Sequence, residues 1–233
     1  MSNELLLIGS LFIIFGGTLL FYYLFGKQGL YCWTVLATLL ANIEVLILVR
    51  AFGLDQTLGN VLFASTFLVT DILSEVYGKK ASQKAVNIGI LTSIAFIILS
   101  QYWLLYTPSS TDWAMPSIKS VFSNTPRLIF ASLIVYAICQ RFDVWAYHKW
   151  WQFTEKLSGD RKKYLWLRNN GSTLISQLLN SILYTCFAFG GMYEWKVIPQ
   201  LILATYVVFV VTSLADTPII YLARIIKPRN EEL

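Results

Sequence analysis

The feature that most constrains this chain is a series of seven long apolar segments separated by shorter polar ones. Crossing the hydrocarbon core of a bilayer takes about 20 apolar residues in a helix, and each segment is long enough. Lipid offers no partner for open backbone groups, and no segment alternates as barrel strands do, so all seven are predicted to be helices. The predicted spans are residues 5–25, 30–49, 58–77, 85–105, 126–146, 171–190 and 197–222.

The composition supports an all-α, polytopic membrane helix bundle. Of the 233 residues, 56% are hydrophobic and 13% are charged, against about 25% charged in a typical soluble domain. The net charge of +5 comes from short basic segments between the apolar runs, which indicates membrane topology and no nucleic-acid partner. No cofactor and no metal site is expected. The pattern leaves both a monomer and a homo-oligomer open.

The distribution of Lys and Arg predicts the orientation of the chain. The first apolar segment lacks the basic region and cleavage site of a secretory signal, so it is predicted to remain as a span. With the N-terminus outside and the C-terminus in the cytoplasm, every inner segment obeys the positive-inside rule. The predicted location is therefore the plasma (inner) membrane, and only four of the 18 basic residues then lie outside, namely Arg50, Lys119, Arg127 and Lys196.

Two acidic residues, Asp71 and Glu75, lie within the predicted span 58–77. They are four residues apart and so share one face of the helix. Asp71 has no basic partner within its own helix, and an ionisable group inside the membrane is costly unless it has a function or a partner. For Glu75, a pair with Lys79 at i+4 is an equally good alternative to a role in a site.

The predicted span 171–190 carries a polar stripe that begins beside Arg168. Ser172, Ser176 and Asn180 recur every four residues, and Thr173, Gln177 and Tyr184 follow the adjacent row. Such residues also form hydrogen bonds between membrane helices. Six of them on one face favour the wall of a hydrated cavity.

Two further spans carry polar groups of interest. Asp216 precedes Pro218, and proline frees a backbone carbonyl about one turn upstream, so a bent helix would place both groups in a cavity. The alternative is a plain kink with Asp216 bound to a neighbouring arginine. In span 30–49, Asn42 belongs to a polar stripe at four-residue spacing, whereas Glu44 lies about 200° round the helix and is predicted to point away. Asp143 is predicted to form a local ion pair with the adjacent Arg141.

Several of these residues fall in segments that resemble a known family. They are Phe67-Leu68-Val69-Thr70-Asp71-Ile72-Leu73-Ser74-Glu75-Val76-Tyr77-Gly78-Lys79-Lys80, Arg141-Phe142-Asp143-Val144-Trp145, Leu167-Arg168-Asn169-Asn170 followed by Ser172-Thr173 and Ser176-Gln177, and Asp216-Thr217-Pro218-Ile219-Ile220-Tyr221. With them the chain resembles the queuosine precursor transporter family, also called the vitamin uptake transporter family. Two departures are an asparagine, Asn180, where the family has an aspartate, and an added first helix.

The resemblance implies import of 7-deazaguanine bases, the cyano or aminomethyl precursors of the tRNA nucleoside queuosine. It implies a six-helix transporter core at 29–226, preceded by an additional span at 1–28 and followed by a cytoplasmic tail at 227–233. A guanine-like edge has two adjacent N–H donors, and the carboxylate of Asp71 or Asp216 can accept hydrogen bonds from both. The predicted substrate-binding residues are Asn42, Asp71, Glu75, Arg168, Ser172, Ser176, Gln177, Asn180 and Asp216.

A secondary transporter that works by alternating access is the first functional hypothesis. The alternative is the substrate-capture subunit of an ATPase-driven vitamin or nucleobase importer, because the chain itself has no G-x-x-x-x-G-K-[ST] motif. An enzyme is not predicted, since neither H-E-x-x-H nor G-x-S-x-G occurs. A purely structural membrane subunit would not need Asp71.

Overall fold

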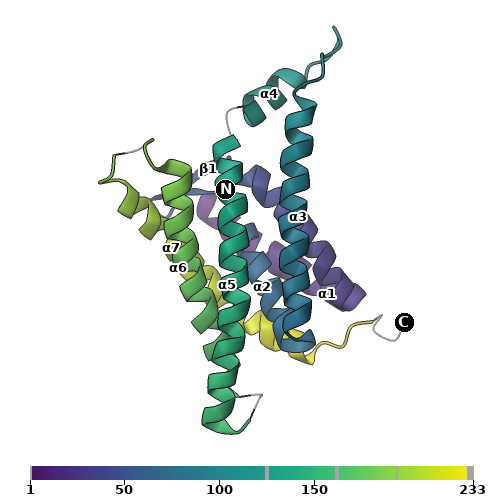
Figure 1. Ribbon diagram of the computed structural model, residues 1–233, viewed down its shortest axis with the longest axis vertical. Coiled ribbons are helices and arrows are strands. Elements are labelled where there is room, and N and C mark those ends of the chain that lie inside the picture. The colour runs from purple at the N-terminus through teal and green to yellow at the C-terminus, as the bar shows by residue number, and fades with distance from the viewer. Residues whose placement is uncertain (1, 124–125, 161–162, 193, 230–233) are drawn as a thin grey trace.

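The computed structural model describes residues 2–123, 126–160, 163–192 and 194–229 (Figure 1). Arg161 and Lys162, two of the residues used to predict the orientation, and the last four residues of the predicted tail lie outside this part. The described elements are α1 Asn3–Glu44, β1 Leu48–Ala51, β2 Leu54–Thr57, α2 Gly59–Tyr77, α3 Lys79–Trp103, α4 Met115–Ser123, α5 Pro126–Ser158, α6 Leu165–Phe189 and α7 Ile198–Ile225.

The first two predicted spans are two limbs of α1, which bends at Gly26. This residue has φ 55° and ψ −135°, a conformation that glycine adopts without the steric cost of a Cβ. By length and composition, five of the described helices could cross a membrane: α1, α2, α3, α6 and α7. The protein is therefore a polytopic helical membrane protein. The predicted span 126–146 lies in α5, which is not among these five.

The predicted span 30–49 is wrong at its end. The helix stops at Glu44, and β1 pairs with β2 as an antiparallel hairpin in which Arg50 lies opposite Asp55. Phe52 and Gly53 connect the strands with φ angles of 53° and 74°, the positive values that a tight hairpin turn requires. The turn overrides the apolar run that predicted a longer helix.

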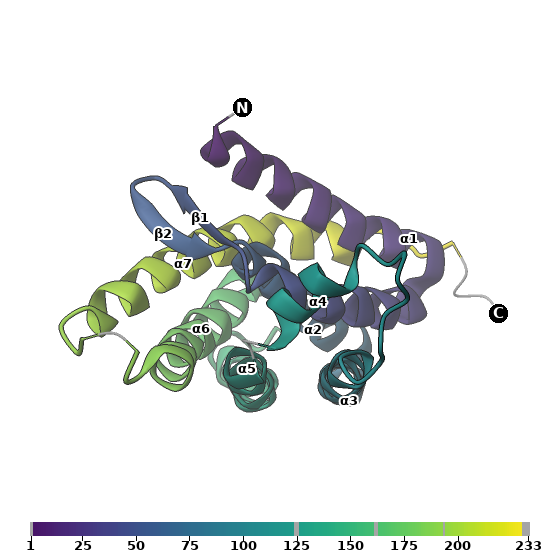
Figure 2. The ribbon, with the colours of Figure 1, turned by 90° about the horizontal axis from the view of Figure 1, so that it is seen from above.

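The long elements alternate in direction between two ends of the bundle. At one end, here called the hairpin end, Asn3 at the start of α1 donates to the carbonyl of Arg50 over 2.9 Å. At the opposite end, the backbone N–H of Arg229 donates to the carbonyl of Tyr23 over 2.8 Å. Seen from above, α3 and α5 are viewed nearly along their axes, and α1 and α7 run obliquely (Figure 2).

Helix α2 occupies the centre of this arrangement. It contacts α1, α3, α5 and α7, and 83% of its most apolar 18-residue window is buried, against 28% for α7. Phe12 on α1 and Leu91 on α3 are 76% and 66% exposed. Large apolar side chains exposed in such number form a surface that suits contact with lipid.

The bend in α1 supplies a test of the packing. A Cβ at Gly29 would lie 1.9 Å from the carbonyl oxygen of Phe21, and backbone cannot give way as a side chain can. We expect Gly29→Ala to reduce the free energy of unfolding by about 1–3 kcal/mol, measured by thermal unfolding in detergent. Gly16→Ala, where nothing lies within 4 Å of the added Cβ, is the matched control. Equal stability of the two variants would contradict the close approach of the two limbs.

Candidate polar site

Two buried carboxyl groups accept hydrogen bonds from neighbouring positions on α6. Thr173 Oγ1 donates to Asp71 Oδ2 over 3.0 Å, and Ser176 Oγ donates to Asp143 Oδ1 over 2.6 Å. Positions three apart lie on the same side of a helix, so α6 holds one acidic group from α2 and one from α5. Asp143 is fully buried while Arg141 is exposed, so the predicted local ion pair between them is wrong.

The two carboxyl groups also lie close to each other. Their partners on α6 are three residues apart, and the charges of Asp71, Asp143 and Asp216 influence one another. Asp71 Oδ1 and Asp143 Oδ2 are buried and have no hydrogen-bond partner among the described residues. Three helices, α2, α5 and α7, therefore each bury one acidic side chain in the interior of the bundle, and α6 donates a hydrogen bond to each of the three.

The third acid, Asp216, is held by α6 as well. Asn169 Nδ2 donates to Asp216 Oδ1 over 2.9 Å, so an asparagine takes the place of the arginine that the alternative prediction proposed. Asn170 Nδ2 donates to Thr217 Oγ1 over 2.8 Å. Helix α7 continues through Pro218 from Ile198 to Ile225. The helix is therefore not broken beside Asp216.

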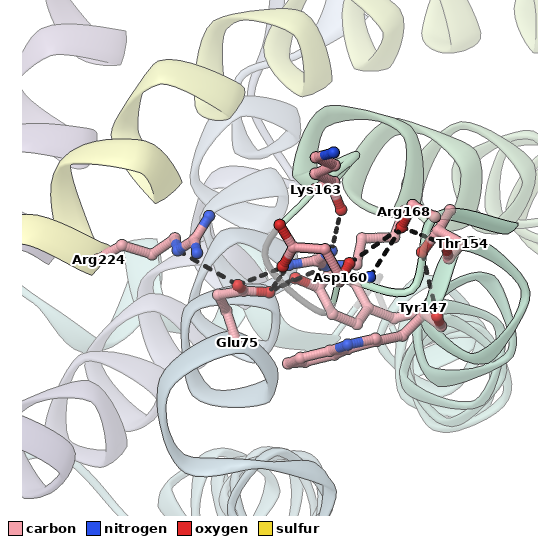
Figure 3. Close-up of polar contacts among 9 residues, drawn as sticks. Glu75, Tyr147, Thr154, Asp160, Lys163, Arg168 and Arg224 are labelled. Carbon is pink, nitrogen blue, oxygen red and sulfur yellow. Dashed lines mark hydrogen bonds and ion pairs between the residues drawn. The ribbon is translucent and has the colours of Figure 1, made fainter. Parts of the chain in front are cut away.

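A second group of charged residues lies one turn further along α2, toward the opposite end (Figure 3). Glu75 accepts three contacts from the guanidinium of Arg168, at 2.6, 2.7 and 3.0 Å. Tyr147 Oη donates to Glu75 Oε2 over 2.8 Å, and Arg224 Nε lies 3.4 Å from Oε1. Within the described residues Glu75 pairs with these arginines and not with Lys79, because the chain breaks from α2 into α3 at Gly78.

The guanidinium of Arg168 has two further contacts besides those with Glu75. Its Nη1 donates to the carbonyl of Lys163 over 2.8 Å, and its guanidinium lies 4.5 Å from the ring centre of Trp151. The side chain is fully buried. We call Glu75, Tyr147, Arg168 and Arg224 the charged cluster.

Two adjoining cavities lie in the half of the bundle nearer the hairpin end. The larger has a volume of about 30 Å³, room for ordered water only, and is lined in part by Asn180, Tyr184 and Asn60. The smaller is lined in part by Asn42 and shares Ala41, Phe63 and Ser132 with the larger. Asn60 Nδ2 and Tyr184 Oη are buried and have no partner among the described residues. The cavities thus combine aromatic rings with unsatisfied polar groups.

The predicted site residues therefore separate into three levels. Asn42 and Asn180 line the cavities, and Glu75 and Arg168 form the charged cluster. Between them lie Asp71, Asp143 and Asp216, which we call the acidic group, and Ser176, which donates to Asp143. Ser172 donates to backbone carbonyls of its own helix, and Gln177 is buried with Oε1 unpaired. The two cavities are not lined by Asp71, Gln177 or Asp216, although one common pocket was predicted for them.

Sequence reasoning missed Asp143, Asn60 and Phe63. Asp143 carried a signal, since residues two apart on a helix point about 200° apart and Arg141 cannot share its face. Asn60 and Phe63 are single residues at the start of an apolar helix. They have no periodic pattern that could have identified them.

The charged cluster predicts unequal effects of removing its two principal members. Glu75→Gln leaves buried Arg168 without its anion, and breaking a buried pair in this way costs on the order of 3–5 kcal/mol. Arg168→Gln leaves Glu75 in contact with Arg224, so we expect a smaller loss. The double variant is expected to lose less than the sum of the two single losses, measured as unfolding free energies in detergent. Additive losses would show that the pair is not coupled, and Asp55→Asn on the exposed hairpin is the control.

Comparison with known proteins agrees with these observations. Residues 57–223 match the model of the family described as "Putative vitamin uptake transporter". Over 213 residues, 91% of each chain, the sequence is 37% identical to the "Probable queuosine precursor transporter" of Bacillus subtilis (strain 168). No solved structure matches the chain.

All the segments that carried the sequence resemblance lie within or reach into the matched region, so the resemblance is confirmed. The match also confirms that the chain is a transporter and not an enzyme. The protein belongs to the vitamin uptake transporter family of multi-pass membrane proteins.

Proposed function

We propose that this protein imports queuosine precursors, 7-deazaguanine bases in the cyano or aminomethyl form, by alternating access. The observation that carries the proposal is the 37% identity, over 91% of both chains, to the Bacillus subtilis protein named "Probable queuosine precursor transporter". The polar groups buried in a bundle with a lipid-facing exterior support it, because intramembrane ionisable groups mark transport pathways.

The transporter core in this proposal is the region 29–226, with the first limb of α1 as an additional span and a tail from 227. The second limb of α1 supports its inclusion in the core. Its polar residues Thr34, Thr38 and Asn42 are all buried, and Asn42 lines a cavity with residues of α2, α3 and α5.

The proposed orientation places the hairpin end outside and the opposite end in the cytoplasm. Three of the four basic residues that were predicted to lie outside are at the hairpin end. They are Arg50 of the hairpin, Lys119 of α4 and Arg127 at the start of α5. Lys27, Lys79 and Lys163 lie at the opposite end. This arrangement agrees with the positive-inside rule.

In this orientation the cavities lie in the outer half and the charged cluster lies below them. For a planar base to enter, the helices have to part around these cavities, because the larger has a volume of only about 30 Å³. The base could then stack against Tyr184 or Phe63, while the amides of Asn42, Asn60 and Asn180 both donate and accept hydrogen bonds. A solute that leaves such buried groups unpaired is rejected. The acidic group, with Asp71 and Asp216, would meet the base on its way inward, and passage beyond it requires the contacts of Glu75 with Arg168 to open.

The experiment is uptake of a labelled 7-deazaguanine base into liposomes that contain only the purified protein. We expect accumulation without a partner protein, and rescue of queuosine in the tRNA of an uptake-deficient cell at limiting external base. Uptake that requires an added ATPase module would instead indicate a substrate-capture subunit.

A cavity variant tests where the base binds. Asn180→Leu removes a cavity amide and is expected to reduce the rate of uptake about tenfold or more, since it strands a polar group of the base. Ile182→Leu, on the exposed side of the same helix, is the matched control and should transport normally. Normal uptake by Asn180→Leu would contradict the assignment of this cavity.

A further inference from the structure

Asp71 and Asp143 are two buried carboxyl groups that each receive only one hydrogen bond from the described residues. Both side chains are fully buried. One oxygen of each accepts a hydroxyl of α6, from Thr173 or Ser176. The remaining oxygens, Asp71 Oδ1 and Asp143 Oδ2, are buried and have no partner in the described chain.

The groups that face this pair do not neutralise it. Asp216 on α7 and Glu75 on α2 are further acids, and Tyr147 and Cys139 on α5 are the other titratable neighbours. Arg168, the nearby buried cation, is bound to Glu75, to a backbone carbonyl and to the Trp151 ring. In the described chain no basic side chain forms an ion pair with either Asp71 or Asp143.

Two buried carboxylates beside each other repel, and the repulsion favours the neutral form of one of them. A single proton bound by the pair removes the repulsion and adds a donor to a site in which two buried oxygens have none. A metal ion fits the site less well, because the described residues contain no cluster of three or more His, Cys, Asp or Glu side chains that could hold one. The geometry therefore suits a proton as the ligand.

We infer that the Asp71–Asp143 pair is a proton-binding site that carries one proton inward with each imported base. This inference rests on the proposed transport function and adds its source of energy. The step balances simply, since an O–H bond forms with a proton from outside and breaks to release the same proton inside. The link to the solute is α6, because Ser176, which holds Asp143, is one turn from Asn180 in the cavity wall.

The test uses the full chain in liposomes with a pH-sensitive dye in the lumen and labelled 7-cyano-7-deazaguanine outside. Making the outside one pH unit more acidic should drive accumulation of the base up to about tenfold, the limit for one proton per solute. Adding base without a pH gradient should acidify the lumen. Because both readings are made on the unchanged protein, they do not depend on whether a variant folds.

Asp143→Asn tests whether this pair carries the effect. The variant keeps a side chain of similar shape for Ser176 but cannot bind and release a proton, so uptake should lose its dependence on external pH and lumen acidification should disappear. Asp55→Asn, on the exposed hairpin, should behave as the unchanged protein. A pH-dependent Asp143→Asn would overturn the assignment.

The two proposals can fail separately. If the unchanged protein exchanges labelled for unlabelled base at equal pH, but a sodium gradient drives accumulation and a pH gradient does not, proton coupling is wrong and the transport function stands. If it neither exchanges nor accumulates the base, the transport function itself is wrong and the coupling inference falls with it.

Discussion

Burial of charged and amide side chains inside a bundle that faces lipid is the constraint on which the rest of this structure depends. Helix α6 provides hydrogen-bond partners for these buried groups, because its polar side chains contact three other helices. Asn169 binds Asp216 on α7, Thr173 binds Asp71 on α2, and Ser176 binds Asp143 on α5. The periodicity of one helix therefore sets the positions of its neighbours, since an unpaired polar group inside the membrane is costly.

The acidic group and the charged cluster differ in kind although they adjoin along α2. Asp71 and Glu75 are four residues apart, which is about 6 Å along a helix at 1.5 Å per residue. Glu75 has two arginines and a tyrosine as partners. Asp71 faces other acids. The same helix thus places a paired glutamate beside the carboxyl pair that we propose binds a proton.

Part of this could be predicted from the sequence, because helical periodicity and the cost of buried charge act locally. The polar stripe on 171–190 and the shared face of Asp71 and Glu75 follow from spacing alone. Which acid meets which partner depends on tertiary packing, so Asp143 was predicted to pair with Arg141. The hairpin at 48–57 was missed because an apolar count does not register the turn at Phe52 and Gly53, and the cavity is lined by single residues of several helices, which no single periodicity marks.

The three levels of the site are joined by one rigid element. Asn180, Ser176 and Arg168 lie on α6 within about 18 Å, at 1.5 Å per residue, and each belongs to a different level. A movement of α6 that parts Arg168 from Glu75 would also move the hydroxyls that hold the carboxyl pair and the amide in the cavity wall. Solute binding, proton binding and opening of the opposite end can then bias one equilibrium, which is the physical requirement for coupling between separate sites.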